Sequence, residues 1–135
     1  MAEYRKPLPV PSPVSRPFWD GLGDSEVRIQ RCSSCGEYVF YPRPHCTACL
    51  SDSLEWVVLG GGGKVYSFTI VRRAMNPAFA EDVPYVYAIV ELDEGPRLMT
   101  NIVGCAPEDV RVDMPVKAVY DRVTPEMTLL KFQPQ

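Results

Sequence analysis

Hydrophobic side chains near the start of this chain recur with a helical spacing. Between residues 15 and 22, Phe18, Trp19 and Leu22 would lie on one side of a helix, which predicts a single short helix there. Ser15 is suited to cap its N-terminus, and two nearby glycines limit its length. We expect the apolar side of this helix to be a contact surface, either for the rest of the chain or for a partner.

After this helix the hydrophobic positions alternate with a period of two, which is typical of β-strands. Asp93–Pro96 predicts a hairpin turn between two of these strands, and Pro107–Asp109 predicts one helical turn. The predicted strands are Val27–Cys32, Glu37–Tyr41, Leu54–Leu59, Lys64–Arg73, Tyr85–Leu92, Arg97–Val103, Val116–Val123 and Thr128–Phe132.

The last five predicted strands follow a run of four glycines, Gly60–Gly63. This run lacks the GK[ST] sequence of a phosphate loop and leads into a strand, so we interpret it as a flexible hinge or bulge. In the strand that follows, alternation places Tyr66, Phe68 and Ile70 on one face. Five short strands with one longer loop, Ala74–Pro84, suit a closed Greek-key barrel of the OB type, although an SH3-like barrel has similar strand statistics.

Prolines dominate the segment before the helix. Four of them occupy alternate positions between residues 7 and 13, which excludes a helix interior and predicts an extended arm. Two interpretations of this arm stay open: a disordered tail, and a segment that lies along another protein. Leu8 and Val10 fit the second interpretation, because an arm exposed to water has little reason to carry them.

Four cysteines form two CxxC pairs, Cys32 with Cys35 and Cys46 with Cys49, with ten residues between the pairs. Each pair can direct two sulfurs from one tight turn towards a single ion, and two such turns supply the tetrahedral four-thiolate set that structural zinc prefers. Gly36 follows the first pair, where the backbone has to curl around the sulfurs. A closed cage leaves no position for water, so we expect one structural Zn²⁺.

Other interpretations of these cysteines explain less. Two disulfides would require an oxidising compartment, and a redox CxxC would open a helix after a strand without needing a second pair. Iron accepts the same four thiolates, so the choice between zinc and iron stays open at this point. His45 would be a surplus ligand in a complete set, and we expect it at the surface. The predicted organisation is an arm with a short helix over residues 1–26, a zinc ribbon over 27–59 and a barrel over 60–135.

Composition narrows the classes of function. The chain has 14 Lys and Arg against 17 Asp and Glu, a net charge of −3 that disfavours a nucleic-acid binder. Its apolar runs are too short for a membrane span and no signal peptide is recognisable, so we expect a cytoplasmic protein. The single histidine lies beside the metal-binding cysteines, which leaves no Ser-His or Cys-His pair for catalysis. Cys105, the remaining thiol, is expected to be partly buried and inert.

Several of these motifs occur in an order that resembles a known family. The succession is Cys32-x-x-Cys35-Gly36, Tyr41-Pro42-Arg43-Pro44-His45-Cys46-x-x-Cys49, Trp56, Gly61-x-Gly63-x-Val65-Tyr66-Ser67-Phe68-Thr69, Pro84-Tyr85 and Val90-Glu91-Leu92-Asp93-Glu94-Gly95. It resembles the acyl-CoA-associated OB-fold family, also called domain of unknown function thirty-five. The resemblance extends from residue 15 to residue 132, nearly the whole chain.

The resemblance implies a mostly β protein with a short helical N-terminus, a rubredoxin-like zinc ribbon and a C-terminal five-stranded OB-fold barrel. It also implies a non-catalytic accessory subunit of a thiolase-like enzyme, either a lipid-transfer-type thiolase or an aldol lyase, acting on acyl-CoA or sterol side-chain CoA thioesters. An enoyl-CoA hydratase is the other class of partner that it implies. In such a complex Leu8, Val10, Phe18 and Trp19 are the candidate partner contacts.

Two further features could serve a CoA thioester. Arg72 and Arg73 end the first barrel strand, where a cation could meet a phosphate, and Phe79 and Tyr85 could flank an adenine or an acyl chain. A solvated pair of charges is the competing interpretation of the two arginines. Three hypotheses therefore stand: an accessory subunit, a free-standing acyl-CoA-binding module, and a zinc-ribbon/OB nucleic-acid binder. The acidic composition counts against the third, which would need a basic groove.

Overall fold

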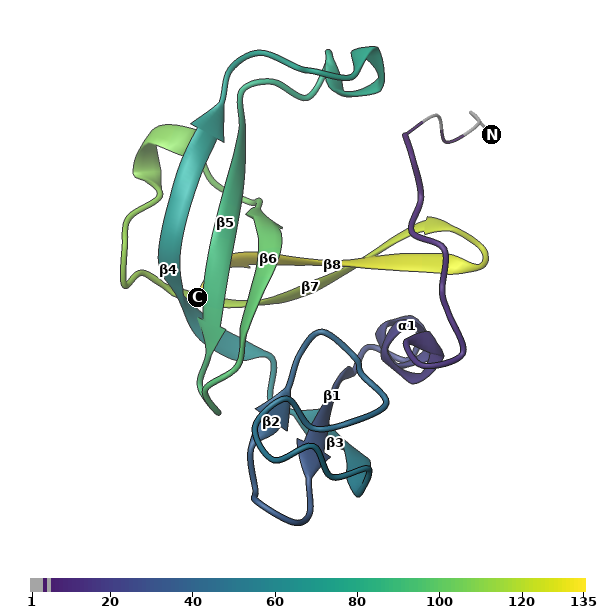
Figure 1. The fold of residues 1–135 in the computed structure, drawn as a ribbon. Helices are drawn as coiled ribbons and strands as arrows, with labels where there is room; N and C mark the ends of the chain where they lie inside the picture. Colours follow the sequence, from purple (N-terminus) through teal and green to yellow (C-terminus); the bar gives the residue numbers. More distant parts are fainter. Residues whose placement is uncertain (1–3, 5) are drawn as a thin grey trace.

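The computed structural model describes residue 4 and residues 6–135. Residues 1–3 and 5, at the start of the predicted arm, lie outside the described residues. Figure 1 shows a β-barrel above a smaller β-ribbon, with one helix beside them. The elements are α1 (Arg16–Gly23), β1 (Val27–Cys32), β2 (Tyr38–Val39), β3 (Leu54–Leu59), β4 (Gly62–Val71), η1 (Pro77–Phe79), β5 (Tyr85–Leu92), β6 (Arg97–Ile102), η2 (Pro107–Asp109), β7 (Pro115–Thr124) and β8 (Met127–Pro134).

The helix α1 begins where the sequence predicts, immediately after Ser15 and with Pro17 in its first turn. The expected cap differs in detail, because the Ser15 side chain makes no capping hydrogen bond. Its Oγ instead accepts the backbone N–H of Ser12 at 2.9 Å, and the Arg16 N–H donates to the Ser12 carbonyl oxygen at 2.9 Å. The turn that precedes α1 therefore orients its first residues.

The ribbon is a three-stranded antiparallel sheet in the order β2-β1-β3. β1 and β3 have the predicted bounds and pair along their whole length. β2 is shorter than predicted and covers only Tyr38–Val39, since the chain leaves the sheet at Phe40 to reach the second CxxC pair.

The five remaining strands close into a barrel in the order β4-β5-β6-β8-β7. Neighbouring strands are antiparallel except β6 and β8, which meet in parallel at Ile102 and Phe132. This is a small Greek-key barrel of the OB type, so the predicted fold class is confirmed. The long loop between β4 and β5 rises above the barrel in Figure 1 and carries the short helix η1.

The glycine run belongs to the barrel instead of acting as a hinge. β4 begins at Gly62, and a Cβ built on Gly63 would lie 2.5 Å from the carbonyl oxygen of Glu91 on the neighbouring strand. Gly61 has a φ of +82° and lies against the Ala118 side chain. Glycine is therefore required by close strand approach and by one left-handed backbone position.

A β-bulge interrupts the alternation that the sequence predicts for β4. The pairing with β5 shifts register between Val65 and Ser67, so Val65 is fully buried and Tyr66 is exposed. Beyond the bulge Phe68 and Ile70 pack towards the core. The prediction that Tyr66, Phe68 and Ile70 share one face is therefore wrong at Tyr66, because an extra residue reverses the facing of a strand.

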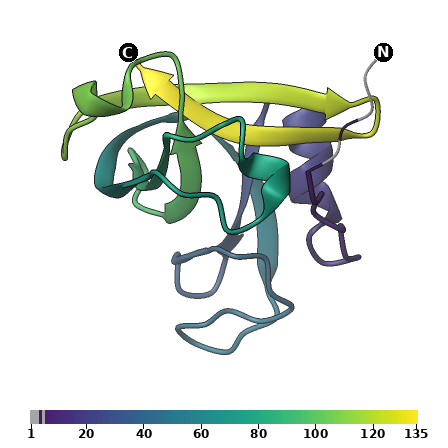
Figure 2. The ribbon, with the colours of Figure 1, turned by 90° about the horizontal axis from the view of Figure 1, so that it is seen from above.

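One apolar core joins the helix, the ribbon and the barrel. Phe18 of α1 and Ile29 of β1 belong to the same buried cluster as the inward residues of the barrel strands. Figure 2 shows α1 under one end of the β7–β8 hairpin, with which it is in contact. A second cluster at the far end of the ribbon contains only Cys32, Val39 and Cys46 as buried residues.

Candidate functional site

The four cysteine sulfurs converge at the end of the ribbon that lies away from the barrel. All four Sγ atoms lie within 4.8 Å of one another, with 3.6 Å between Cys32 and Cys49 and 3.6 Å between Cys35 and Cys46. A tetrahedral ion with bonds of about 2.3 Å would separate its sulfur ligands by about 3.8 Å. The donor set and its spacing fit a metal, and the four cysteines are positioned to bind one.

The two CxxC turns have the same backbone hydrogen bonds. In the first turn the Gly36 N–H donates to the Cys32 carbonyl at 2.8 Å, and in the second the Leu50 N–H donates to the Cys46 carbonyl at 2.9 Å. Gly36 and Leu50 also share a left-handed backbone, with φ of 81° and 65°. The second turn thus places a leucine where the first uses a glycine, which is why only the first turn was recognisable from its glycine.

Backbone N–H groups favour the ionised form of the first thiol in each turn. Hydrogen bonds from the backbone of Cys35 and then Ser34 lower the pKa of Cys32 to about 6. Those from Cys49 and Ala48 lower the pKa of Cys46, and the Ala48 nitrogen lies 3.3 Å from the Cys46 Sγ. In the second thiol of each turn, Cys35 and Cys49, the backbone hydrogen bonds from Glu37 and Ser51 are outweighed by burial and by sharing protons with the other sulfurs, so the pKa is raised. Metal ligation needs thiolates, so the local geometry favours Cys32 and Cys46 as the first to ionise.

A buried glutamine ties the second turn to the sheet. Gln30 of β1 is 6% exposed, and its amide donates to the Arg43 carbonyl at 2.8 Å and accepts the Arg43 N–H at 2.7 Å. This pair of hydrogen bonds fixes the chain just before Cys46. His45 is exposed and does not belong to the group of converging sulfurs, as expected from the sequence.

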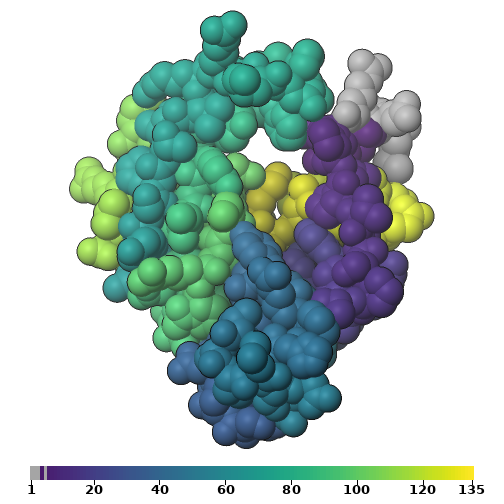
Figure 3. Space-filling view, in the orientation of Figure 1, coloured from purple at the N-terminus to yellow at the C-terminus, as the bar shows by residue number. Residues whose placement is uncertain are grey.

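A second candidate site lies between the barrel, α1 and the arm. Figure 3 shows an opening through the molecule, bordered by the barrel strands, the loop between β4 and β5, and the arm. Two adjoining hollows of about 280 Å³ and 260 Å³ lie here, and they share Asn101, Leu129 and Lys131 as lining residues.

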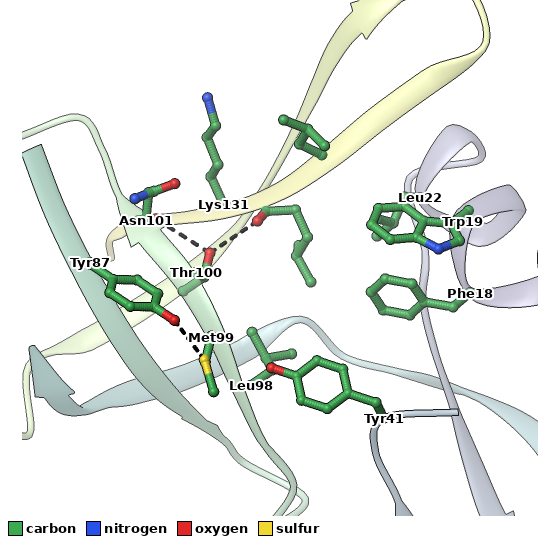
Figure 4. Close-up of a pocket in the computed structure, with 12 residues that line it drawn as sticks. Phe18, Trp19, Leu22, Tyr41, Tyr87, Leu98, Met99, Thr100, Asn101 and Lys131 are labelled. Carbon is green, nitrogen blue, oxygen red and sulfur yellow. Dashed lines mark hydrogen bonds between the residues drawn. The ribbon is translucent and has the colours of Figure 1, made fainter. Parts of the chain in front are cut away.

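The first hollow is mainly apolar. Phe18, Trp19 and Leu22 of α1 face Leu98 and Met99 of β6 across it, as Figure 4 shows. Its polar groups are largely engaged with one another. The Tyr87 hydroxyl lies 2.6 Å from the Met99 sulfur, and the Thr100 hydroxyl donates to the Leu130 carbonyl at 3.0 Å. This hollow suits an apolar group more than a charged one.

The second hollow contains two of the predicted CoA-contacting residues. Phe79 and Tyr85 both line it, with their ring centroids 6.3 Å apart. Arg72 and Arg73 are exposed and line neither hollow. The structure therefore brings the two aromatic residues together and leaves the two arginines outside.

Two lysines, absent from the sequence-based set, line the second hollow. Lys6 of the arm lies 2.6 Å from Asp82 of the loop, and Lys131 of β8 lies 2.6 Å from Asp121 of β7. Their positions depend on tertiary structure, since each lysine pairs with a carboxylate of another segment. A sequence signal did exist for this side of the barrel. Tyr87 is two residues from Tyr85 in β5, so both lie on the same face of the strand, and Tyr87 lines the first hollow.

The four predicted partner contacts differ in exposure. Val10 is 90% exposed and Leu8 is 38% exposed, so both are accessible on the arm. Phe18 is only 7% exposed and packs edge-on against Trp19, with ring centroids 5.1 Å apart. Its expected exposure to a partner is therefore wrong, because this ring anchors α1 to the core. Trp19 is half-buried and lines the first hollow.

Two family models match this chain in succession. The model described as "ChsH2, rubredoxin-like zinc ribbon domain" matches residues 19–55, and "ChsH2, C-terminal OB-fold domain" matches residues 56–121. A chain of the solved structure "Ltp2-ChsH2(DUF35) aldolase" aligns with a TM-score of 0.85 and 36% identity, covering 94% of this chain and 98% of that one. The protein belongs to the ChsH2 (DUF35) family. The resemblance found in the sequence is therefore confirmed.

Curated relatives within the ChsH2 family have several names. A "Probable enoyl-CoA hydratase alpha subunit" from Thermomonospora curvata is 40% identical over 87% of this chain and 36% of its own length. A "DUF35 domain-containing scaffold protein" from Methanocaldococcus jannaschii is 43% identical over 69% of this chain and 66% of its own length. A "Benzoylsuccinyl-CoA thiolase subunit BbsA" from Geobacter metallireducens is 32% identical over 72% and 58%. This ChsH2-family chain thus spans about a third of the hydratase subunit and about two thirds of the scaffold protein.

Two remaining expectations concern the rest of the ChsH2-family chain. Among the residues that the structure describes, no helix has the length and apolar character needed to span a membrane. Cys105 is half-buried and packs against the main core, and burial raises the pKa of its thiol. An elevated pKa leaves little thiolate at neutral pH, as expected for an inert cysteine.

Proposed function

We propose that this protein is a non-catalytic accessory subunit of a thiolase-like enzyme, a lipid-transfer-type thiolase or an aldol lyase, acting on acyl-CoA or sterol side-chain CoA thioesters. The observation that carries the proposal is the match along 98% of a chain in the solved Ltp2-ChsH2 aldolase. The relatives named as a scaffold protein and as a thiolase subunit support the same role. The relative named as a hydratase alpha subunit makes an enoyl-CoA hydratase the other partner class.

The metal in this proposal is Zn²⁺, held by Cys32, Cys35, Cys46 and Cys49. Four thiolates would complete its tetrahedral set, so the ion would hold the two turns together and leave no position for a substrate. Thiolate ligands persist most easily where thiols stay reduced, which is consistent with the proposed cytoplasmic location.

The absence of catalysis is proposed from the side chains in the described part of the chain. The only histidine, His45, is exposed beside the metal turn, and Cys105 has a raised pKa. Among the carboxylates, Glu91 accepts the Arg97 guanidinium at 2.9 Å and is thereby held as an ion-pair partner. Among the described residues, no hydrogen bond joins the His45 or Cys105 side chain to an acid or base; the Asp109 carboxylate near Cys105 only adds to the raised pKa of that thiol.

A CoA thioester would contact this subunit at the paired hollows. Phe79 and Tyr85 would flank an adenine or acyl group, and the apolar hollow beside Trp19 would accept a hydrocarbon portion. Arg72 and Arg73 are exposed and line neither hollow, so any contact they make with the phosphates would lie outside both hollows. Leu8, Val10 and Trp19 remain as the proposed partner contacts.

The test is co-expression of the tagged chain with a thiolase-like enzyme from the same host, followed by complex mass and CoA-thioester turnover. We expect a stable complex whose turnover depends on the enzyme subunit.

Deleting residues 1–14 is expected to raise the Kd of the complex by about tenfold, roughly 1.4 kcal/mol, with the barrel still folded. Val10→Ala should weaken the complex, whereas Val112→Ala, at a 57% exposed valine elsewhere, serves as its control. Turnover of acyl-CoA by the isolated chain, or the lack of any complex with thiolase or hydratase, would overturn the proposal.

The hollow beside α1 favours one alternative, a free-standing acyl-CoA-binding module. Its volume of about 280 Å³ and apolar lining would hold part of an acyl chain without another subunit. Calorimetric titration of the isolated chain with octanoyl-CoA separates the two functions. Micromolar binding by a chain that forms no complex supports the module, and binding only in the complex supports the accessory subunit.

A further inference from the structure

The arm passes beside the barrel from α1 to the long loop between β4 and β5. Figures 1 and 3 show it on the side of the opening opposite β5 and β6. Its C-terminal end is fixed by the turn at Ser12, whose carbonyl oxygen accepts the N–H groups of Ser15 and Arg16 at 3.1 and 2.9 Å. The border of the opening thus depends on what holds the other end of the arm.

In the described part of the arm, Lys6 makes the ion pair that holds the other end, and Tyr4 lies beside it at the second hollow. The Lys6 ammonium lies 2.6 Å from the Asp82 carboxylate and 5.9 Å from the centre of the Phe79 ring, both on the loop. The hydrogen bond that Lys6 donates to the Asp82 carboxylate raises the pKa of Lys6, so the lysine stays charged. Asp82 itself is held in place by its backbone N–H, which donates to the Phe79 carbonyl at 3.0 Å.

The segment between these two anchors adds little of its own. Three of its residues, Pro7, Pro9 and Pro11, are prolines, which cannot donate a backbone hydrogen bond to the barrel. Among the described residues, no backbone hydrogen bond joins positions 6–11 to a barrel strand. Proline also restricts the backbone, so the segment would move as a stiff unit once its end is released.

We propose that residues 6–14 form a strap along one side of the opening, with its Lys6 end at the second hollow and the Lys6–Asp82 pair as its latch. With the latch closed, the strap completes a ring around the opening, and a long ligand has to pass through it end first. With the latch open, a ligand with a bulky polar head can enter from the side. The inference rests on the proposed function, because the ligand in question is the CoA thioester of that site.

The strength of the latch fits reversible opening. The side chains of Lys6 and Asp82 are 30% and 39% exposed, and ion pairs at such positions shift an equilibrium by about two- to fivefold. The outward positions of Leu8 and Val10, on the same segment, give a docked enzyme subunit a direct contact with the strap. A partner can therefore set the position of the strap with a few contacts.

The first experiment follows the strap without any ligand. ¹⁵N relaxation of the full-length protein should give Leu8 and Val10 amide order parameters near about 0.8, and Lys6→Ala or Asp82→Ala should lower them below about 0.6. The double reversal Lys6→Asp with Asp82→Lys should restore them. Lys64→Ala is the control, because Lys64 pairs with Glu91 and Asp113 away from the strap. Low order parameters in the unmodified protein, or no change in the variants, would overturn the latch.

The second experiment measures entry of a ligand. Stopped-flow tryptophan fluorescence with dodecanoyl-CoA should show association and dissociation rates about two- to fivefold faster in Lys6→Ala than in the unmodified protein, with the double reversal restoring both. Unchanged rates in a variant whose strap has become mobile would show that the strap does not control ligand entry, which we call its gate function, although the Lys6–Asp82 latch would still hold the strap. If dodecanoyl-CoA binds no variant, the CoA contact of the proposed function is wrong and the gate with it, whereas the relaxation data still decide the latch.

Discussion

The metal end of the ribbon and the barrel are stabilised by different chemistry. In the barrel, buried apolar residues such as Val90, Val116 and Phe132 form part of one large cluster. At the metal end, two of the three residues in the buried cluster are cysteines of the metal site, Cys32 and Cys46. A unit with so little apolar burial needs another source of stability, and the four cysteines of this tip are positioned to supply it by binding a metal. We therefore expect the barrel to fold by apolar burial and the tip to fold by metal ligation.

The largest effect is expected from removing one ligand of the tip. Cys32→Ser and Cys46→Ser should each abolish stoichiometric metal binding, because structural zinc sites contribute apparent binding energies of about 10–16 kcal/mol. Elemental analysis should fall from one metal per chain to none, and hydrogen exchange should quicken in residues 32–54 while the barrel strands stay protected. Cys105→Ser is the matched control and should keep its metal. Loss of barrel protection in the ligand variants would contradict the division between the two regions.

The reverse effect is expected in the barrel. Phe132 is fully buried, and Phe132→Ala should lower the free energy of unfolding by about 3–5 kcal/mol through lost burial and a cavity. Chemical denaturation followed by circular dichroism measures it, with Met75→Ala as the control at a 95% exposed position. The folded fraction should retain its metal. If Phe132→Ala releases metal from folded protein, metal binding at the tip depends on the packing of the barrel as well as on the four cysteines.

A smaller effect tests the close approach of two barrel strands. Gly63→Ala should destabilise the protein by about 1–3 kcal/mol, because the added Cβ would meet the Glu91 carbonyl at 2.5 Å and the strand would have to shift. Gly23→Ala at the end of α1 adds a Cβ with no atom within 4 Å, so it should be neutral or slightly stabilising. Equal unfolding midpoints for the two variants would show that the strands have more freedom than this contact allows.

The smallest effect distinguishes the two CxxC turns. Leu50 is 77% exposed and has a left-handed backbone, which costs a residue other than glycine about 1–2 kcal/mol. Leu50→Gly should therefore stabilise the tip by about 1 kcal/mol or less, after the greater freedom of glycine in the unfolded chain is subtracted. Gly36→Ala, at the equivalent position of the first turn, should weaken it by a similar amount. Competition with a zinc chelator measures both, and a weaker site in Leu50→Gly would contradict the strain at Leu50.

Local pattern predicted the elements well where the backbone is regular. The bounds of β1, β3, β5 and η2 agree with the sequence prediction because hydrophobic alternation and proline act over a few residues. The bulge in β4 escaped prediction because the hydrophobic alternation stays regular on each side of it. The extra residue changes only which face the residues before the bulge share with those after it. The metal set was predictable from spacing alone. The Lys6–Asp82 pair was not, since it joins segments that only the fold brings together.

Burial decided which aromatic residues could be interpreted correctly. Phe18 and Trp19 are neighbours with the same apparent role in the sequence, yet one is in the core and the other lines a hollow. The pattern of a short helix fixes its apolar side but not how deeply each residue on that side is buried. Phe79 and Tyr85 are close for a different reason, because the loop before β5 folds back over the strand end.

The core shared by α1, β1 and the barrel has a mechanical consequence. Ile29 and Val65 belong to one buried cluster, so the ribbon cannot swing about Gly60 without exposing apolar surface to water. The shared core therefore fixes the distance and the orientation of the cysteine tip relative to the opening beside α1. A partner that grips the tip would find the opening at the same place and angle each time, so alignment would be built into the subunit before assembly begins.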